Sequence, residues 1–202
     1  VLFLKSLPKV AFQCLAKMEI EDDDMVESLS EVEGVFQACS SSLRFLRVQR
    51  CWKLRSVSRG LQHLTALESL VLIDLPKLRS VSRGLQHLTA LESLELIDLR
   101  ELRFDETQGQ EEEEEEMPWR CLAQCLHTLK LSDLDEVFNL PKGMRYLTAL
   151  QSLQIDYLPL KDVPEWIGCL PSLQSVKITR CKHLESLPES LGNLTSLITD
   201  VS

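Results

Sequence analysis

The chain of 202 residues lacks the features that mark several common classes of protein. Its longest uninterrupted apolar runs are about four residues, whereas a membrane-spanning helix needs about 20. A charged start followed by an apolar run and a small-residue cleavage site is not found at its beginning, so no membrane segment and no secretory signal is visible. Basic residues are in the minority, 22 against 31 acidic ones, and the formal net charge of -9 disfavours a nucleic-acid partner.

Glycine, proline and aromatic residues are also scarce, with 7 Gly, 8 Pro and 11 Phe, Trp and Tyr together. With 44% hydrophobic residues, this composition excludes collagen-like, linker-like and disordered chains. The apolar content is supplied mainly by 40 leucines, which predicts a leucine-built core. The seven cysteines are odd in number and scattered, so we expect reduced and mostly buried thiols instead of a disulfide framework.

A long internal repeat is the strongest signal in the sequence. Residues 53–75 and 77–99 are identical at 22 of 23 positions, and Val71 in the first copy is replaced by Glu95 in the second. A copy displaced by 24 residues indicates duplication of one structural unit. The L-x-x-L-x-L core of that unit recurs at Leu15/Met18/Ile20, Leu43/Leu46/Val48, Leu67/Leu70/Leu72, Leu91/Leu94/Leu96, Leu126/Leu129/Leu131, Leu150/Leu153/Ile155 and Leu173/Val176/Ile178, and Leu197 opens an eighth unit.

This period and pattern resemble the leucine-rich repeat, in which each unit contributes a short strand and a returning segment, and stacked units bury a ladder of leucines. The expected fold is therefore an α/β solenoid, a right-handed horseshoe arc with a parallel β-sheet on its concave face. We expect residues 1–202 to form a single leucine-rich repeat domain of about seven or eight repeats. Because the chain opens at Val1 and stops in mid-pattern at Ser202, we also expect it to be a fragment of a larger protein.

Several units continue with a leucine or valine followed by proline, as in Leu187-Pro188, Leu140-Pro141 and Val163-Pro164. Cysteine occupies the ninth position of two units, at Cys51 and Cys181, and residues 191–197 read LGNLTSL. In these features the chain resembles the repeat domain of plant nucleotide-binding leucine-rich repeat (NLR) disease resistance proteins. The resemblance implies a cytoplasmic location, and it implies ADP or ATP only in a neighbouring nucleotide-binding domain. The G-x-x-x-x-G-K-[ST] phosphate loop does not occur in this chain, so no cofactor is expected here.

One step between units is 35 residues, longer than its neighbours, and the excess falls in residues 104–118. This segment contains Asp105, Glu106 and the run from Glu111 to Glu116. Adjacent carboxylates repel one another and bury nothing, so we interpret the segment as a solvated acidic insertion loop. Contact with a basic surface of a partner domain is an alternative interpretation.

Candidate metal and catalytic groups are weak in this sequence. His63 and His87 are copies of one residue without a third ligand, and Cys121 and Cys125 lack a second ligand pair, so no metal site is expected. A serine elbow, an H-E-x-x-H motif and a plausible Cys-His pair are all missing, so the chain is not expected to be an enzyme. Asn193-Leu194-Thr195 is a glycosylation sequon, but we interpret it as an ordinary repeat phrase.

The residues between the inward leucines point to the concave side, because side chains alternate along a strand. This outward array is the predicted protein-binding site, and its apolar members suggest protein contact. By register it contains Phe45, Arg47, Arg50, Val71, Ile73, Glu95, Ile97, Lys130, Tyr157, Lys177 and Arg180.

Two functions fit these features. The first is a non-enzymatic interaction module of a plant intracellular immune receptor, which senses a pathogen effector or a guarded host protein and restrains its own nucleotide-binding domain. The alternative is an extracellular repeat protein that inhibits a cell-wall hydrolase or binds a peptide. A phosphate loop encoded upstream of Val1 would favour the first function, and a signal peptide would favour the second.

Overall fold

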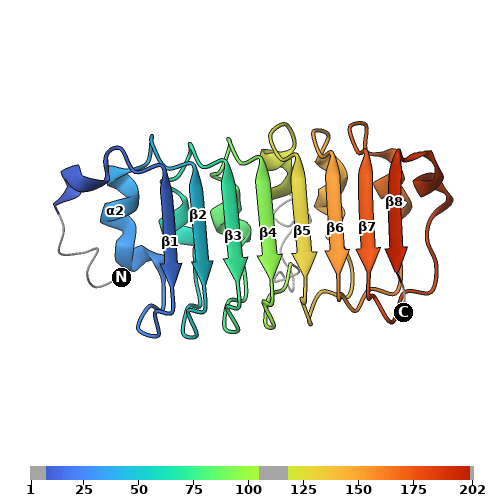
Figure 1. Ribbon diagram of the computed structural model, residues 1–202, viewed down its shortest axis with the longest axis horizontal. Helices are drawn as coiled ribbons and strands as arrows, with labels where there is room; N and C mark the ends of the chain where they lie inside the picture. The colour runs from blue at the N-terminus through green and yellow to red at the C-terminus, as the bar shows by residue number, and fades with distance from the viewer. Residues whose placement is uncertain (1–7, 105–117, 201–202) are drawn as a thin grey trace.

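The computed structural model describes residues 8–104 and 118–200 of the chain. Eight parallel strands form one sheet in the order of the sequence (Figure 1). They are β1 Lys17–Glu21, β2 Phe45–Gln49, β3 Ser69–Ile73, β4 Ser93–Ile97, β5 Thr128–Ser132, β6 Ser152–Asp156, β7 Ser175–Thr179 and β8 Ser196–Asp200. Each predicted L-x-x-L-x-L core thus contains one strand, and the predicted parallel solenoid is confirmed.

Short helices return the chain behind the sheet and occupy its other side (Figure 1). The α-helices are α2 Glu33–Ala38, α3 Ser58–Leu61 and α4 Ser82–Leu85, with a further helical turn in residues 118–122. The 3-10 helices are η1 Lys9–Phe12, η2 Leu29–Val32, η3 Lys142–Tyr146, η4 Glu165–Cys169 and η5 Glu189–Asn193. Few residues connect one strand to the next, so the helices in these connections are only one or two turns long.

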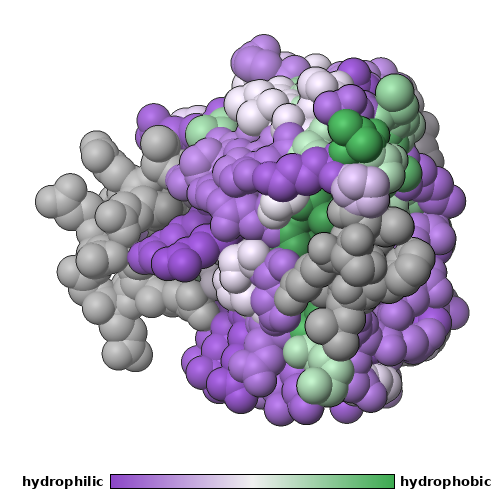
Figure 2. Space-filling model, turned by 90° about the vertical axis from the view of Figure 1, so that its left-hand side faces the viewer, coloured by the Kyte–Doolittle hydropathy of each residue, from purple (hydrophilic) through white to green (hydrophobic). Residues whose placement is uncertain are grey.

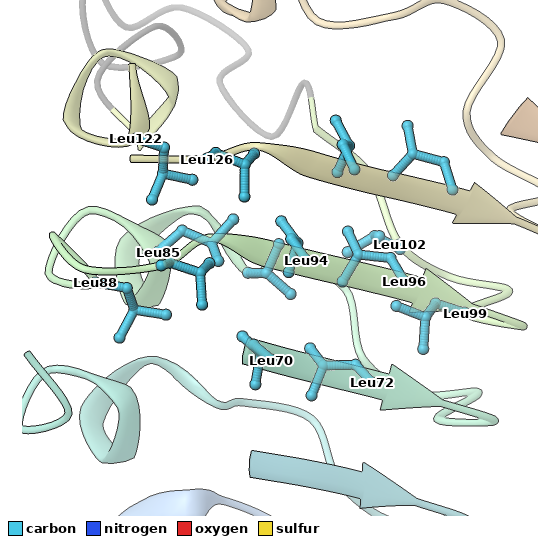
Figure 3. Packing of buried hydrophobic residues seen from close by; sticks show 14 of the residues in the cluster. Leu70, Leu72, Leu85, Leu88, Leu94, Leu96, Leu99, Leu102, Leu122 and Leu126 are labelled. Carbon is cyan, nitrogen blue, oxygen red and sulfur yellow. The ribbon is translucent and has the colours of Figure 1, made fainter. Parts of the chain in front are cut away.

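The core is a ladder of leucines between the strands and the helices (Figure 3). Leu94 and Leu96 of β4 are fully buried, as are their counterparts Leu70 and Leu72 in β3. From the second to the seventh unit the ninth position is buried too, including Cys51 and Cys181, so a cysteine at this position fills the ladder. Because every unit packs only against its neighbours, a cavity in the core of one unit weakens its packing against both adjacent units.

The first unit is longer than the duplicated units that follow it and adds η2 and α2 behind β1 and β2. Ser28 caps η2 in a capping box, in which its hydroxyl accepts from the Ser30 backbone N–H and Glu31 accepts from the backbone of Ser28. Phe36 of α2 is fully buried in the core. Figure 2 looks onto this end of the stack, where hydrophilic atoms dominate the visible surface and a narrow hydrophobic band shows near the middle.

The chain on both sides of the acidic insertion is fixed to the core. Phe104 and Trp119 are buried and pack edge to face, with ring centroids 5.6 Å apart. Phe104 and Pro118, the two ends of the predicted loop 104–118, are both buried. The remaining residues, 105–117, lie outside the described part of the chain, and so does the prediction of a solvated loop.

Candidate functional site

Parallel pairing in register arranges the outward side chains of the sheet in rows that cross the strands. Each strand presents three outward positions, and the same position of neighbouring strands lies side by side because the units are stacked without offset. The central row consists of Glu19, Arg47, Val71, Glu95, Lys130, Gln154, Lys177 and Ile198. We call this outward surface the concave face.

The structure brings all the predicted site residues to this face or to its edge. Five of them lie in the central row, namely Arg47, Val71, Glu95, Lys130 and Lys177. Phe45 stands at the start of β2, and Ile73 and Ile97 stand opposite each other at the ends of β3 and β4. The other three directly follow a strand and line its carboxyl end, namely Arg50, Tyr157 and Arg180.

Val71 differs from the expectation of an exposed contact residue. It lies on the outward side, yet only 2% of its surface is accessible. Its short side chain stands in register between Arg47 and Glu95 on the two adjacent strands. With so little of its surface accessible, Val71 does not itself offer a surface to a partner.

A cationic and aromatic cluster occupies the β1–β2 end of the concave face. The ammonium of Lys17 lies 5.1 Å from the centre of the Phe45 ring, and the guanidinium carbon of Arg47 lies 5.7 Å from it. Both distances fall within the range of cation–π attraction. The Nε atom of Arg47 is buried without a hydrogen-bond partner in the described structure, so this end of the face holds an unused donor beside an aromatic ring.

The residue after each of the first seven strands has a left-handed backbone, although none of the seven is glycine. These residues are Asp22, Arg50, Asp74, Asp98, Asp133, Tyr157 and Arg180, with φ between 50° and 56°. Each backbone N–H donates to the last carbonyl of the next strand, as in Asp74 to Ile97 at 3.0 Å. This extra hydrogen bond extends the ladder by one rung and offsets the cost of the positive φ. The sequence analysis did not find this shared conformation.

Asp22 and Arg50 form the best-defined ion pair at the edge of the face. The Nε atom of Arg50 donates to one carboxylate oxygen at 2.5 Å and an Nη atom donates to the other at 2.9 Å. The hydrogen bond from Arg50 lowers the pKa of Asp22, and the same contact raises the pKa of the guanidinium. Because both groups are solvent-exposed, the pair orients Arg50 more than it stabilises the fold.

A second polar cluster lies at the end of β6 and β7. The hydroxyl of Thr179 donates to Asp156 at 2.6 Å, and an Nη atom of Arg180 lies 3.6 Å from the same carboxylate. The guanidinium also stands over the ring of Tyr157, with its carbon 4.9 Å from the ring centre. Tyr157 keeps 44% of its surface accessible, so this cluster presents an aromatic ring held in place by a cation.

A row of small hydroxyl residues at the start of the strands was missed by the sequence analysis. From β3 to β8 the first outward position is always serine or threonine, in Ser69, Ser93, Thr128, Ser152, Ser175 and Ser196. The signal was present, since each unit from the third onward has Ser or Thr directly before its second inward residue. Short side chains here leave the central row accessible from the side and offer hydroxyl groups for hydrogen bonding.

The other candidate groups do not assemble into a reactive site. His63 lies 2.8 Å from a carboxylate oxygen of Glu33 and 3.1 Å from Gln62, whereas its copy His87 meets Gln86. Within residues 8–104 and 118–200, no three His, Cys, Asp or Glu side chains are grouped as metal ligands. All seven cysteines are free, but only Cys39, Cys51 and Cys181 are buried, so the expectation of mostly buried thiols is wrong.

Comparison with known proteins agrees with the geometry of the stack. The family model described as R13L1/DRL21 LRRs matches residues 142–199. The leucine-rich repeat domain of the type III effector XopL superposes with a TM-score of 0.64 at 20% identity, over 93% of this chain and 61% of that chain. The chain folds as a leucine-rich repeat domain. TLR13 in complex with ssRNA13 contains the same fold, with a TM-score of 0.61 at 18% identity.

The match to TLR13 covers 98% of this chain but only 34% of the TLR13 chain. This chain therefore corresponds to only part of that structure. No curated protein sequence matches it significantly. Among the described residues, no helix is both long enough and apolar enough to cross a bilayer.

Proposed function

We propose that this leucine-rich repeat domain is a protein-interaction module of a plant intracellular immune receptor, and that its concave face binds a pathogen effector or a guarded host protein. The match of residues 142–199 to the R13L1/DRL21 repeats is the observation that carries the immune assignment. The plant context and the cytoplasmic location are part of this proposal. ADP or ATP would belong to an adjacent nucleotide-binding domain, which the repeat domain would restrain through surface contacts.

The chemistry of the concave face supports a protein ligand. It combines the Phe45 cluster at one end and the Tyr157 cluster at the other with the half-buried pair Ile73 and Ile97 between them. Aromatic and arginine side chains contribute most of the free energy at many protein interfaces. None of these side chains belongs to the leucine ladder, so the face can differ between receptors while the fold stays the same.

A recognition assay in the complete receptor tests the proposal. Replacing Phe45, Lys130 and Tyr157 by Ala, singly and together, should abolish the resistance response to the matching pathogen strain at normal protein abundance. Lys182→Ala, an exposed change outside the face, should leave the response intact. Leu94→Ala empties a fully buried site and should cost about 2 to 5 kcal/mol, which lowers abundance and response together.

Two results would contradict the proposal. Full recognition by every concave-face variant at normal abundance would remove the concave face as the binding site. A signal peptide encoded upstream of Val1, instead of a phosphate loop, would replace the intracellular receptor with the extracellular alternative.

A further inference from the structure

The two copies of the duplicated segment place six cations on the loops that leave β2 and β3 and on the helices that follow them. These residues, here called the basic strip, are Lys53, Arg55, Arg59, Lys77, Arg79 and Arg83. All six are exposed, and they alternate with the buried residues Leu54, Val57, Gly60, Leu78, Val81 and Gly84. In Figure 1 the strip begins in the loops below the arrowheads of β2 and β3 and continues behind the sheet.

The basic strip is a local excess of positive charge on an acidic protein. Residues 53–60 and 77–84 contain no Asp or Glu, although the whole chain has a formal net charge of -9. Arg79 pairs with Glu101 at 2.9 Å. The other five cations make no side-chain hydrogen bond or ion pair within the described residues. Their charge is therefore available to a partner.

Stacking places like charges side by side in the strip. β2 and β3 pair in register with a displacement of 24 residues, so Lys53 and Lys77, and likewise Arg55 and Arg79, hold equivalent positions in two adjacent units of the stack. Like charges that lie close together repel one another. An anionic group that lies between the two rows of cations would relieve this repulsion, and no group of the duplicated segments does so.

The strip ends abruptly after two units. In the preceding unit the position of Arg55 is held by Glu27, whose carbonyl accepts from the Arg55 backbone at 2.9 Å. In the following unit the position of Lys77 is held by Glu101, and Arg103 is paired with Glu136 at 2.9 Å. The acidic borders limit the width of the strip to about two unit spacings, or roughly 10 Å.

We infer that the basic strip is a second interaction surface, separate from the concave face, which binds a short acidic segment of a partner protein. Carboxylates of that segment would lie between the two rows of cations. Trp52 is 47% exposed directly before Lys53 and offers an aromatic contact to the same segment. A nucleic acid fits less well, because its evenly spaced phosphates would extend past the strip onto Glu27 and Glu101.

A binding measurement with a defined probe tests this inference. The probe is a fluorescent peptide with six consecutive Glu residues, titrated with the full chain and followed by anisotropy at several salt concentrations. The variant Lys53→Glu with Lys77→Glu should weaken binding at least tenfold and flatten the salt dependence. The control Lys161→Glu with Lys182→Glu changes two exposed cations elsewhere by the same charge and should shift the affinity less than twofold.

The charge-neutral variant Lys53→Gln with Lys77→Gln, checked by its melting temperature, should also weaken binding and thus separates lost attraction from misfolding. The chain has an acidic run of its own, so a variant with Gln at each position from Glu111 to Glu116 is titrated in parallel. Tighter peptide binding by this variant would support the strip and identify the run as a competitor. An equal loss of peptide affinity in the Lys161→Glu, Lys182→Glu control would overturn the inference. So would the absence of peptide binding by both the unsubstituted chain and the variant with Gln at each position from Glu111 to Glu116. The inference would also be overturned if a DNA duplex bound more tightly than the peptide and lost its binding in the Lys53 and Lys77 variants.

Discussion

The duplicated segments provide a controlled comparison of one substitution in two structural environments. Gly60 and Gly84 occupy the same position of the repeat, in α3 and α4, and both are buried. A Cβ atom added at Gly60 would lie 2.6 Å from the Cβ atom of Leu29 and 2.9 Å from its carbonyl oxygen. A Cβ atom added at Gly84 would lie 2.9 Å from a terminal methyl group of Leu61 and no nearer than 3.3 Å to any other neighbour.

These distances predict different costs for the same change to alanine. At Gly60 the overlap involves the backbone and the Cβ atom of Leu29, which move only with η2, so we expect an overpacking cost of about 1 to 3 kcal/mol. At Gly84 the Leu61 methyl group can rotate away. Alanine is also favoured over glycine in a helix by up to about 1 kcal/mol. Gly84→Ala should therefore be close to neutral, whereas Gly60→Ala should destabilise the domain.

Thermal and urea unfolding of the two single variants, measured beside the unsubstituted chain, would check this prediction. For a domain of this size, about 1 kcal/mol corresponds to a shift in Tm of about 2 to 4 °C. We expect a clear drop for Gly60→Ala and a shift within about 2 °C for Gly84→Ala. Equal effects in both copies would refute the reasoning, because the cost would then depend on the local sequence and not on the neighbouring unit.

Two further predictions concern ionisable groups. Burial raises the pKa of four cysteines, and three of them, Cys39, Cys51 and Cys181, are also buried. At neutral pH these three should react slowly with a thiol reagent, whereas the two exposed thiols react at once and all seven react in denaturant. Fast labelling of more than the exposed thiols and the half-buried Cys121 and Cys125 would contradict this. Replacing Arg50 by Gln should raise the pKa of Asp22 toward the ordinary carboxyl value of about 3.9, as followed by NMR titration. Because the pKa of Asp22 is lowered in the folded chain, the ion pair is fully formed above the ordinary carboxyl pKa and is lost as the pH falls through the folded pKa. An unchanged Asp22 titration in the Arg50→Gln variant would show that Arg50 does not cause the lowered pKa.

The part of the fold that repeats was predictable from the sequence, because the inward positions of each strand require apolar side chains whatever the neighbouring unit contains. Leu94 and Leu153, for example, are buried as the L-x-x-L-x-L pattern predicts. The outward positions of the predicted site followed from the same alternation, and so did the side of the sheet on which Arg47 and Lys130 lie. Both inferences need only the geometry of a strand.

The features that were not predicted depend on contacts between units. Val71 is buried although it lies on the outward side, where strand alternation alone predicts an exposed residue. The left-handed backbone at Arg50 and Tyr157 is stabilised by a carbonyl of the next unit, and neither residue type indicates a positive φ by itself. The packing of Phe104 against Trp119 was not predicted either, since it joins residues on the two sides of the acidic insertion.

Identical residues in the two copies therefore do not have identical surroundings. Both histidines meet the glutamine before them, but only His63 also meets a carboxylate, Glu33, because α2 precedes its unit and the unit before His87 has no α2. The cations of the basic strip behave in the same way, since Arg79 finds Glu101 in the following unit while Arg55 finds a like charge there. In a stack of this kind the sequence of one unit fixes its fold, and the unit beside it decides which of its exposed groups are left to bind a partner.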